Sequence, residues 1–180
     1  MCTPERLAAL WLAVLLVSAA ATAADDGPRL GVAATAEQIA AWDISIPPDG
    51  SGLPAGLGNV AEGERVYAAK CQSCHGEAGR GEPNDALAGG RGTLASDAPV
   101  RTVGSYWPYA TTLFDYIRRA MPLLQPQSLG NDEVYALTAY ILSLNGIVDG
   151  NAVMDARSLP RVVMPNRGGF IAVYPRSPAE

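Results

Sequence analysis

One pentapeptide constrains this 180-residue chain more than any other feature, because it holds two of the chain's three cysteines and its one histidine. The sequence contains three cysteines and one histidine. Two of the cysteines, Cys71 and Cys74, are separated by two residues, and His75 follows directly. The third, Cys2, stands near the start of the chain. Chemistry that needs both cysteine and histidine must therefore be built at residues 71–75.

The composition of this pentapeptide argues against the other common uses of a C-x-x-C pair. A zinc site needs four ligands, mostly cysteine and histidine, and only three are available here. A redox dithiol is expected beside a βαβ pattern, which does not flank these residues. A disulfide between cysteines three positions apart would constrain almost no chain. C-x-x-C-H is instead the signature of covalent haem c attachment, with Cys71 and Cys74 bonded to the haem and His75 as an iron ligand.

The single histidine also limits the other axial position of the iron. A second histidine ligand is impossible, so the sixth ligand is a methionine, an unusual group or nothing. A vacant position would make the chain a gas-binding or gas-sensing cytochrome. After removal of an N-terminal signal, three methionines remain as candidates: Met121, Met154 and Met164.

Met121 has the most favourable local sequence of the three. A short helix is expected at 113–120, with Thr111 or Thr112 as its cap. Pro122 disfavours helical geometry in the residue before it, so Met121 follows a helix end and is free to turn its thioether toward a cofactor. The alternative is a methionine that only fills a gap in the core. Met164, also followed by proline, is the second candidate, and Met154 the third.

A helix is expected at 60–70, immediately before the pentapeptide. Asn59 is a favourable N-cap residue. An apolar stripe recurs at helical spacing, formed by Val60, Gly63, Tyr67 and Cys71. A glycine inside a helix costs about 1 kcal/mol relative to alanine. Gly63 therefore indicates that another helix approaches closely, unless it is simply a tolerated surface glycine.

The partner expected for that close approach is a helix at 132–145. Asn131 or Asp132 would cap it, and Gly146 would end it. Its buried stripe is expected to contain Val134, Leu137, Ile141 and Leu144, with Tyr135 and Tyr140 beside it. We interpret these residues as core rather than as cofactor contacts.

Residues 76–108 are rich in glycine, aspartate, serine and proline and are expected to form a loop over the haem. The apolar cover is expected from Leu87, Tyr106, Trp107 and Tyr109. Arg91 or the indole of Trp107 would bind a haem propionate.

The beginning of the chain has the layout of a secretory signal peptide at 1–23, with a short apolar run and an A-x-A pattern ending at Ala23. The run is shorter than the roughly 20 residues that span a bilayer. We therefore expect export to the periplasm, loss of Cys2 and no membrane anchor. The formal net charge is −5, and Lys70 is the one lysine, which disfavours nucleic acid as a partner.

Together these features resemble the class I c-type cytochromes over residues 60–147. The resemblance implies an all-α fold around one covalent haem, with a cytochrome c domain at 59–147. It also implies that His75 and Met121 ligate the iron, and that the chain is an electron carrier and not itself an enzyme.

A narrower resemblance is carried by residues 87–94, 103–112 and 115–122, and more weakly by 39–44, 47–54 and 164–167. These segments are similar to the SoxD-type cytochrome subunits of molybdenum sulfite or sulfane dehydrogenases. The resemblance implies a molybdenum-containing catalytic partner, with a cytochrome c or an oxidase downstream. Some members carry a second haem domain, whereas this sequence has one C-x-x-C-H, so the sulfur substrate stays open. A diffusible carrier is the alternative.

Irregular extensions are expected at 24–58 and 148–180. Thr35 and Gln38 form a capping-box pattern that would begin a short helix in the first. The apolar run at 170–174 would add to a partner as a strand or clamp. In the alternative interpretation, both extensions cover their own haem domain.

Overall fold

The computed structural model describes residues 31–171 and 173, so the predicted signal peptide at 1–23 lies outside the described residues. The chain divides into two units, with the boundary after Trp42. The described part of the first unit holds helix α2 (Ala36–Trp42). The predicted capping box is present: the Gln38 N–H donates to Thr35 Oγ1, and the Thr35 N–H donates to Gln38 Oε1.

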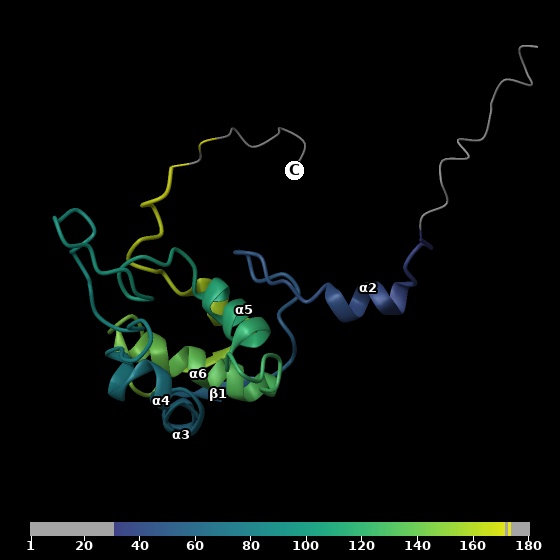
Figure 1. The fold of residues 1–180 in the computed structure, drawn as a ribbon, viewed down its shortest axis with the longest axis horizontal. Coiled ribbons are helices and arrows are strands. Elements are labelled where there is room, and N and C mark those ends of the chain that lie inside the picture. The colour runs from purple at the N-terminus through teal and green to yellow at the C-terminus, as the bar shows by residue number, and fades with distance from the viewer. Residues whose placement is uncertain (1–30, 172, 174–180) are drawn as a thin grey trace, which may run out of the picture. The chain divides into compact units, whose positions relative to one another are not determined.

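The second unit is built around three helices. Helix α3 (Val60–Lys70) and helix α5 (Ala110–Ala120) both pack against helix α6 (Asn131–Leu144). Figure 1 shows α6 between the other two. The four-residue helix α4 (Gln72–His75) and the 3-10 turn η1 (Glu77–Gly79) follow α3.

Helix α3 is capped as the sequence predicts. The Asn59 side chain accepts a hydrogen bond from the Glu62 N–H, and the Glu62 carboxylate accepts one from the Asn59 N–H. Gly63 is buried against α6, where an added Cβ would collide with the carbonyl oxygen of Ala136. The predicted close approach of a second helix at Gly63 is therefore confirmed.

The predicted cap of α6 is wrong by one residue. The cap is Gly130, whose N–H donates to the Glu133 carboxylate. Asn131 is already helical. Asp132 accepts a hydrogen bond from the Leu57 N–H, because the chain before α3 passes beside this helix end. The stripe predicted on α6 is buried at Val134, Leu137 and Ile141, with Leu144 partly covered.

The predicted cap of α5 is also wrong. Helix α5 begins at Ala110, and its N-cap residue, Tyr109, makes no side-chain capping bond. Thr111 is buried inside the first turn, and its hydroxyl donates to the carbonyl of Pro48. The threonine therefore serves a contact between distant segments instead of a helix end.

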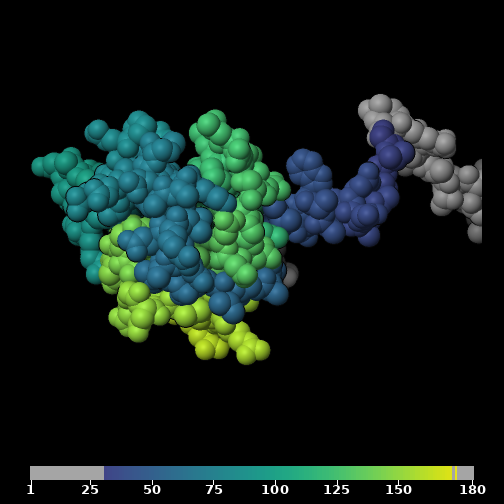
Figure 2. Space-filling model, turned by 90° about the horizontal axis from the view of Figure 1, so that it is seen from below, coloured from purple at the N-terminus to yellow at the C-terminus, as the bar shows by residue number. Residues whose placement is uncertain are grey.

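A two-stranded antiparallel sheet, which the sequence did not predict, joins both ends of the second unit. Strand β1 (Leu57–Asn59) pairs with strand β2 (Val153–Asp155), with Gly58 opposite Met154. Figure 2 shows blue residues that precede α3 beside yellow-green residues of the C-terminal segment. The described residues are otherwise helical or irregular, in keeping with a class I cytochrome fold.

The segment after α6 covers its own domain over most of its described length. Met154, Leu159 in the 3-10 turn η2 (Leu159–Arg161) and Met164 are all buried. Phe170 meets Tyr106 edge-on, with 5.2 Å between ring centroids. Residues 170, 171 and 173 are not in a strand. No helix within the described residues is long and apolar enough to cross a membrane.

Candidate haem site

The second unit contains a cavity of about 530 Å³ between α4, α5, α6 and the loops that join them. A volume of this size is typical of cofactor pockets. Cys71, Cys74, His75 and Met121 all line it. The four residues that the sequence predicts as haem attachment points and iron ligands therefore meet in one place.

The pentapeptide is held by short-range hydrogen bonds. The N–H groups of Cys74 and His75 both donate to the Cys71 carbonyl, at 3.1 and 3.0 Å. The hydroxyl of Tyr67, one turn earlier in α3, donates to the Gly76 carbonyl at 2.8 Å. Tyr67 is 1% exposed, and burial raises its pKa to about 12. The phenol therefore stays protonated and keeps donating this bond at neutral pH.

The orientation of the His75 ring is set by a backbone carbonyl. Nδ1 of His75 lies 2.8 Å from the carbonyl oxygen of Asp85. Because a carbonyl can only accept, Nδ1 must carry the proton, and the lone pair of Nε2 is left free for a metal. Sequence reasoning missed Asp85, since any residue type at that position offers the same carbonyl.

Cys71 and Cys74 do not form a disulfide with each other. Burial raises the pKa of the Cys71 thiol to about 11. Reactive dithiols instead have lowered pKa values, because the thiolate is the nucleophile. The raised pKa therefore does not favour Cys71 as a nucleophile.

Of the three candidate methionines, Met121 is the one that lines the cavity. It is the C-cap residue of α5, with extended backbone angles and its N–H donated to the Ile117 carbonyl. Met154 and Met164 are 5% and 1% exposed and belong to the hydrophobic core, outside the cavity lining. Their burial is the gap-filling use of methionine.

The cavity walls are mostly apolar and come from α5, α6 and the loops on either side of α5. The apolar wall residues include Leu87, Val103, Leu113, Ile117, Leu129, Leu137 and Ile141. Trp107 also lines the cavity and meets Tyr116 edge-on at 5.6 Å between centroids. The predicted cover by Leu87 and Trp107 thus lies where the sequence suggests.

The remaining residues predicted around the haem lie elsewhere. Arg91 is exposed and does not line the cavity, whereas Arg101 does line it. Tyr106 and Tyr109 also lie outside the lining. Tyr109 instead stacks under the guanidinium of Arg167, 4.6 Å from the ring centroid. The segment after α6 therefore packs against the residue that precedes α5.

Asn145, at the end of α6, fixes the wall that contains Leu87. Its amide donates to the carbonyls of Leu87 and Ile141, and its side-chain oxygen accepts from the Gly89 N–H. From the sequence, Asn145 was predicted only as the last residue of the helix. Gly89 and Leu87 lie 56 and 58 positions away, and no local pattern signals such a contact.

The residues present fit a covalently bound haem. Two thiols, an imidazole with a free Nε2 and a thioether share an apolar cavity, which is the donor set of a His/Met haem c site. Among the described residues, no three His, Cys, Asp or Glu side chains gather as a metal site. This donor set therefore suits a haem better than a directly bound metal ion.

Comparison with known proteins agrees with this chemistry. Residues 60–145 match the family described as cytochrome c. The chain is also similar to a solved structure, the sulfane dehydrogenase SoxCD from Paracoccus pantotrophus. The sequences are 44% identical, the match covers 81% of this chain and 72% of that chain, and the TM-score is 0.75.

Proposed function

Because the chain belongs to the c-type cytochrome family, we propose that it is the haem subunit of a molybdenum sulfite or sulfane dehydrogenase. In this role it accepts electrons from a catalytic partner in the periplasm and passes them to a cytochrome c or an oxidase. The observation that carries the proposal is the 44% identity to the SoxCD structure. That match covers 81% of the chain, which is more than residues 60–145 span, so the likeness extends beyond the cytochrome domain itself.

In the proposed assignment, Cys71 and Cys74 hold one haem c covalently, and Nε2 of His75 and the sulfur of Met121 ligate its iron. The bound haem supplies a one-electron ferric–ferrous couple. The chain's own residues orient the imidazole through Asp85 and enclose the site with apolar walls. Arg101, which lines the cavity, replaces Arg91 as the proposed propionate partner, together with Trp107.

The mouth of the cavity offers a surface for electron exchange. Leu123 lines the cavity and is 67% exposed, and its neighbour Leu124 is 91% exposed. Residues 121–131 contain no charged side chain. In Figure 2 the green residues of this loop project beside the teal residues of the loop that precedes α5. We therefore expect an apolar contact with the partner at this edge.

The proposal is tested by purifying the native protein gently from the periplasm and assaying the preparation for molybdenum. Sulfite and a sulfane-sulfur compound are then added separately while haem reduction is followed. A stoichiometric molybdenum subunit and rapid reduction by one of the two compounds are the expected result, and the active compound identifies the substrate class. A lone haem protein without molybdenum would leave a diffusible carrier and contradict the proposal.

The same preparation tests the axial assignment. With His75 and Met121 both bound, the reduced protein should not bind carbon monoxide rapidly at neutral pH. Rapid binding would indicate a vacant sixth position and a gas-binding cytochrome instead.

A further inference from the structure

Helix α5 presents two opposite faces to two different parts of the molecule. One face, with Leu113 and Ile117, lines the cavity and leads to Met121 at the helix end. The other face is contacted by residues 44–48, which we call the strap. At 100° per residue, Thr111, Asp115 and Arg118 lie on the strap side, roughly opposite to the cavity-lining residues.

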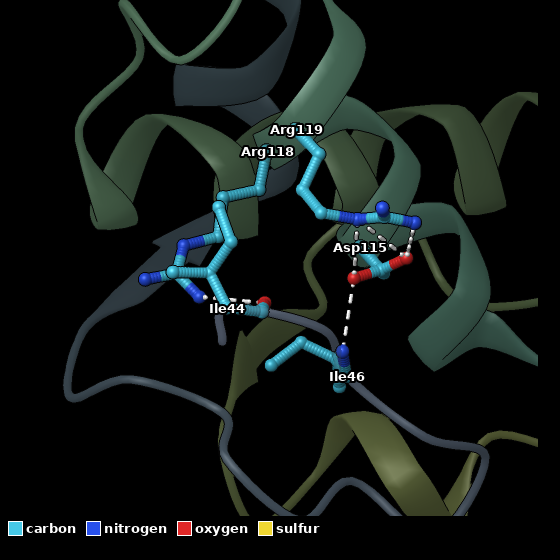
Figure 3. A network of polar contacts seen from close by, with 5 residues as sticks. All are labelled: Ile44, Ile46, Asp115, Arg118 and Arg119. Atoms are coloured by element: carbon cyan, nitrogen blue, oxygen red, sulfur yellow. Dashed lines mark hydrogen bonds and ion pairs between the residues drawn. The ribbon is translucent and has the colours of Figure 1, made fainter. Parts of the chain in front are cut away.

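The strap is joined to α5 by three hydrogen bonds in a regular register. Thr111 Oγ1 donates to the Pro48 carbonyl at 3.2 Å, the Ile46 N–H donates to Asp115 Oδ1 at 2.9 Å, and Arg118 Nη1 donates to the Ile44 carbonyl at 3.3 Å. Figure 3 shows the last two of these contacts.

The spacing of these contacts explains why an extended segment can follow the helix. Every second strap residue is used, and two extended residues advance about 6.6 Å. The contacted helix positions are four and three residues apart and advance about 6 and 4.5 Å. The strap therefore runs antiparallel to α5 in near register, and it makes contact along almost two turns.

Asp115 is the centre of this contact. It is 7% exposed, and its carboxylate is compensated by the Arg119 guanidinium, with Nη2 at 2.6 Å from Oδ2 and Nε at 3.0 Å from Oδ1. The same Oδ1 accepts the Ile46 N–H. A buried carboxylate is tolerated only when it is paired in this way. Figure 3 shows Asp115 between Arg119 and the strap.

We propose that Asp115 is a positioning residue for the Met121 ligand, because it fixes α5 to the strap and thereby sets where the end of α5 delivers the thioether. The inference rests on the proposed role of Met121 as an iron ligand. Without the strap contact, the polar face of α5 loses its buried partners, and the helix is free to shift away from the cavity. The expected result of losing this contact is weaker methionine ligation while the haem attachment at Cys71 and Cys74 is kept.

The test uses the holoprotein and the substitutions Asp115→Ala and Arg119→Gln. Alanine removes the acceptor of the Ile46 N–H, whereas Asp115→Asn keeps an acceptor there and is the conservative variant that should retain the strap contact. Glu133→Gln is the matched control, because Glu133 forms an ion pair of the same length, 2.6 Å with Lys70, away from the strap. Thr111→Val is compared with Thr138→Val, whose hydroxyl bonds only within α6.

Two readouts separate positioning from general stability. The first is the temperature at which the ferric methionine–iron charge-transfer band disappears, compared with the temperature of global unfolding by circular dichroism. The second is the affinity of the ferric haem for imidazole, which must displace the methionine. In Asp115→Ala we expect the band to disappear well before unfolding and imidazole affinity to rise about tenfold, and Asp115→Asn should reverse most of this change. The controls should leave the gap between the two temperatures unchanged.

Band loss and unfolding that shift together in Asp115→Ala, with unchanged imidazole affinity, would overturn the positioning role. If the unsubstituted protein itself lacks the charge-transfer band, the proposed Met121 ligation fails first, and that outcome is distinguishable from failure of the positioning role alone.

Discussion

The two sides of the cavity are held in different ways. On the His75 side, the hydrogen bonds that hold the pentapeptide come from nearby in the sequence: the Tyr67 hydroxyl donates to the Gly76 carbonyl, and the Asp85 carbonyl accepts from the imidazole. On the Met121 side, the hydrogen bonds that fix α5 to the strap join residues 63, 69 and 74 positions apart.

This difference separates what can form early from what needs the whole domain. Short loops cost little chain entropy to close, whereas long-range contacts are favourable only once the intervening chain is folded. We therefore expect haem attachment at Cys71 and Cys74 to be robust to changes elsewhere. Methionine ligation should be the part of the site that responds to remote substitutions.

The largest expected effect tests the independence of the two sides. Replacing Cys71 and Cys74 together by serine should abolish covalent haem incorporation, because no thiol remains to bond the vinyl groups. Met121→Ala should leave covalent incorporation near normal. Mass spectrometry of the purified chains measures both. Loss of covalent haem in Met121→Ala would show that the two sides do not form independently.

The next effect is on the stability of the helix crossing behind the His75 side. Gly63→Ala gains about 1 kcal/mol of helix propensity, but the added Cβ meets the Ala136 carbonyl. Backbone atoms cannot give way as a flexible side chain does, and overpacking typically costs about 1–3 kcal/mol. Chemical denaturation should therefore show net destabilisation. Gly150→Ala, where nothing lies within 4 Å, is the control and should be nearly neutral.

A smaller effect is expected from Tyr67→Phe. The variant keeps the ring contact with Tyr140 but loses the bond to Gly76, at a cost of about 0.5–1.5 kcal/mol. The charge-transfer band of the ferric protein should be unchanged, because the contact belongs to the His75 side. Loss of that band in Tyr67→Phe would mean that the two sides are coupled.

The same substitution changes the alkaline limit of stability. Burial raises the pKa of Tyr67 from about 10 to about 12 in the folded chain. Between these values the unfolded chain releases the proton while the folded chain retains it, so stability falls as pH rises through this window. Denaturation curves at several pH values should show a shallower fall for Tyr67→Phe. Tyr135, whose pKa is raised in the same way, accounts for part of the remaining slope.

The smallest effect on stability is expected at the cavity mouth. Leu124→Ser changes an almost fully exposed side chain and should alter the unfolding free energy by less than about 0.5 kcal/mol. If Leu124 is buried against the partner, its loss slows haem reduction about tenfold in stopped-flow measurements. Val163→Ser, which is also exposed but is not next to a cavity-lining residue as Leu124 is to Leu123, is the control. Equal rates for the two variants would place the exchange surface elsewhere.

The sequence predicted the His75 side well because its signals are local. The pentapeptide, the Asn59 cap and the Gly63 contact are each readable from a few neighbouring residues, and the structure contains all three. The roles of Thr111 and Asp132 were not readable, since each binds a backbone group in a distant segment. The β1–β2 pairing could not be predicted either, because three-residue strands leave little periodicity to detect.

The measurement that tests the account most directly is the ferric absorption spectrum of the holoprotein beside those of Met121→Ala and Met164→Leu. We predict that the methionine–iron charge-transfer band is present in the unsubstituted protein, absent in Met121→Ala and retained in Met164→Leu. Met164 is buried in the core, so that volume-conserving change should affect stability only. A band that survives in Met121→Ala and disappears in Met164→Leu would contradict the assignment of Met121 as the second axial ligand of the iron.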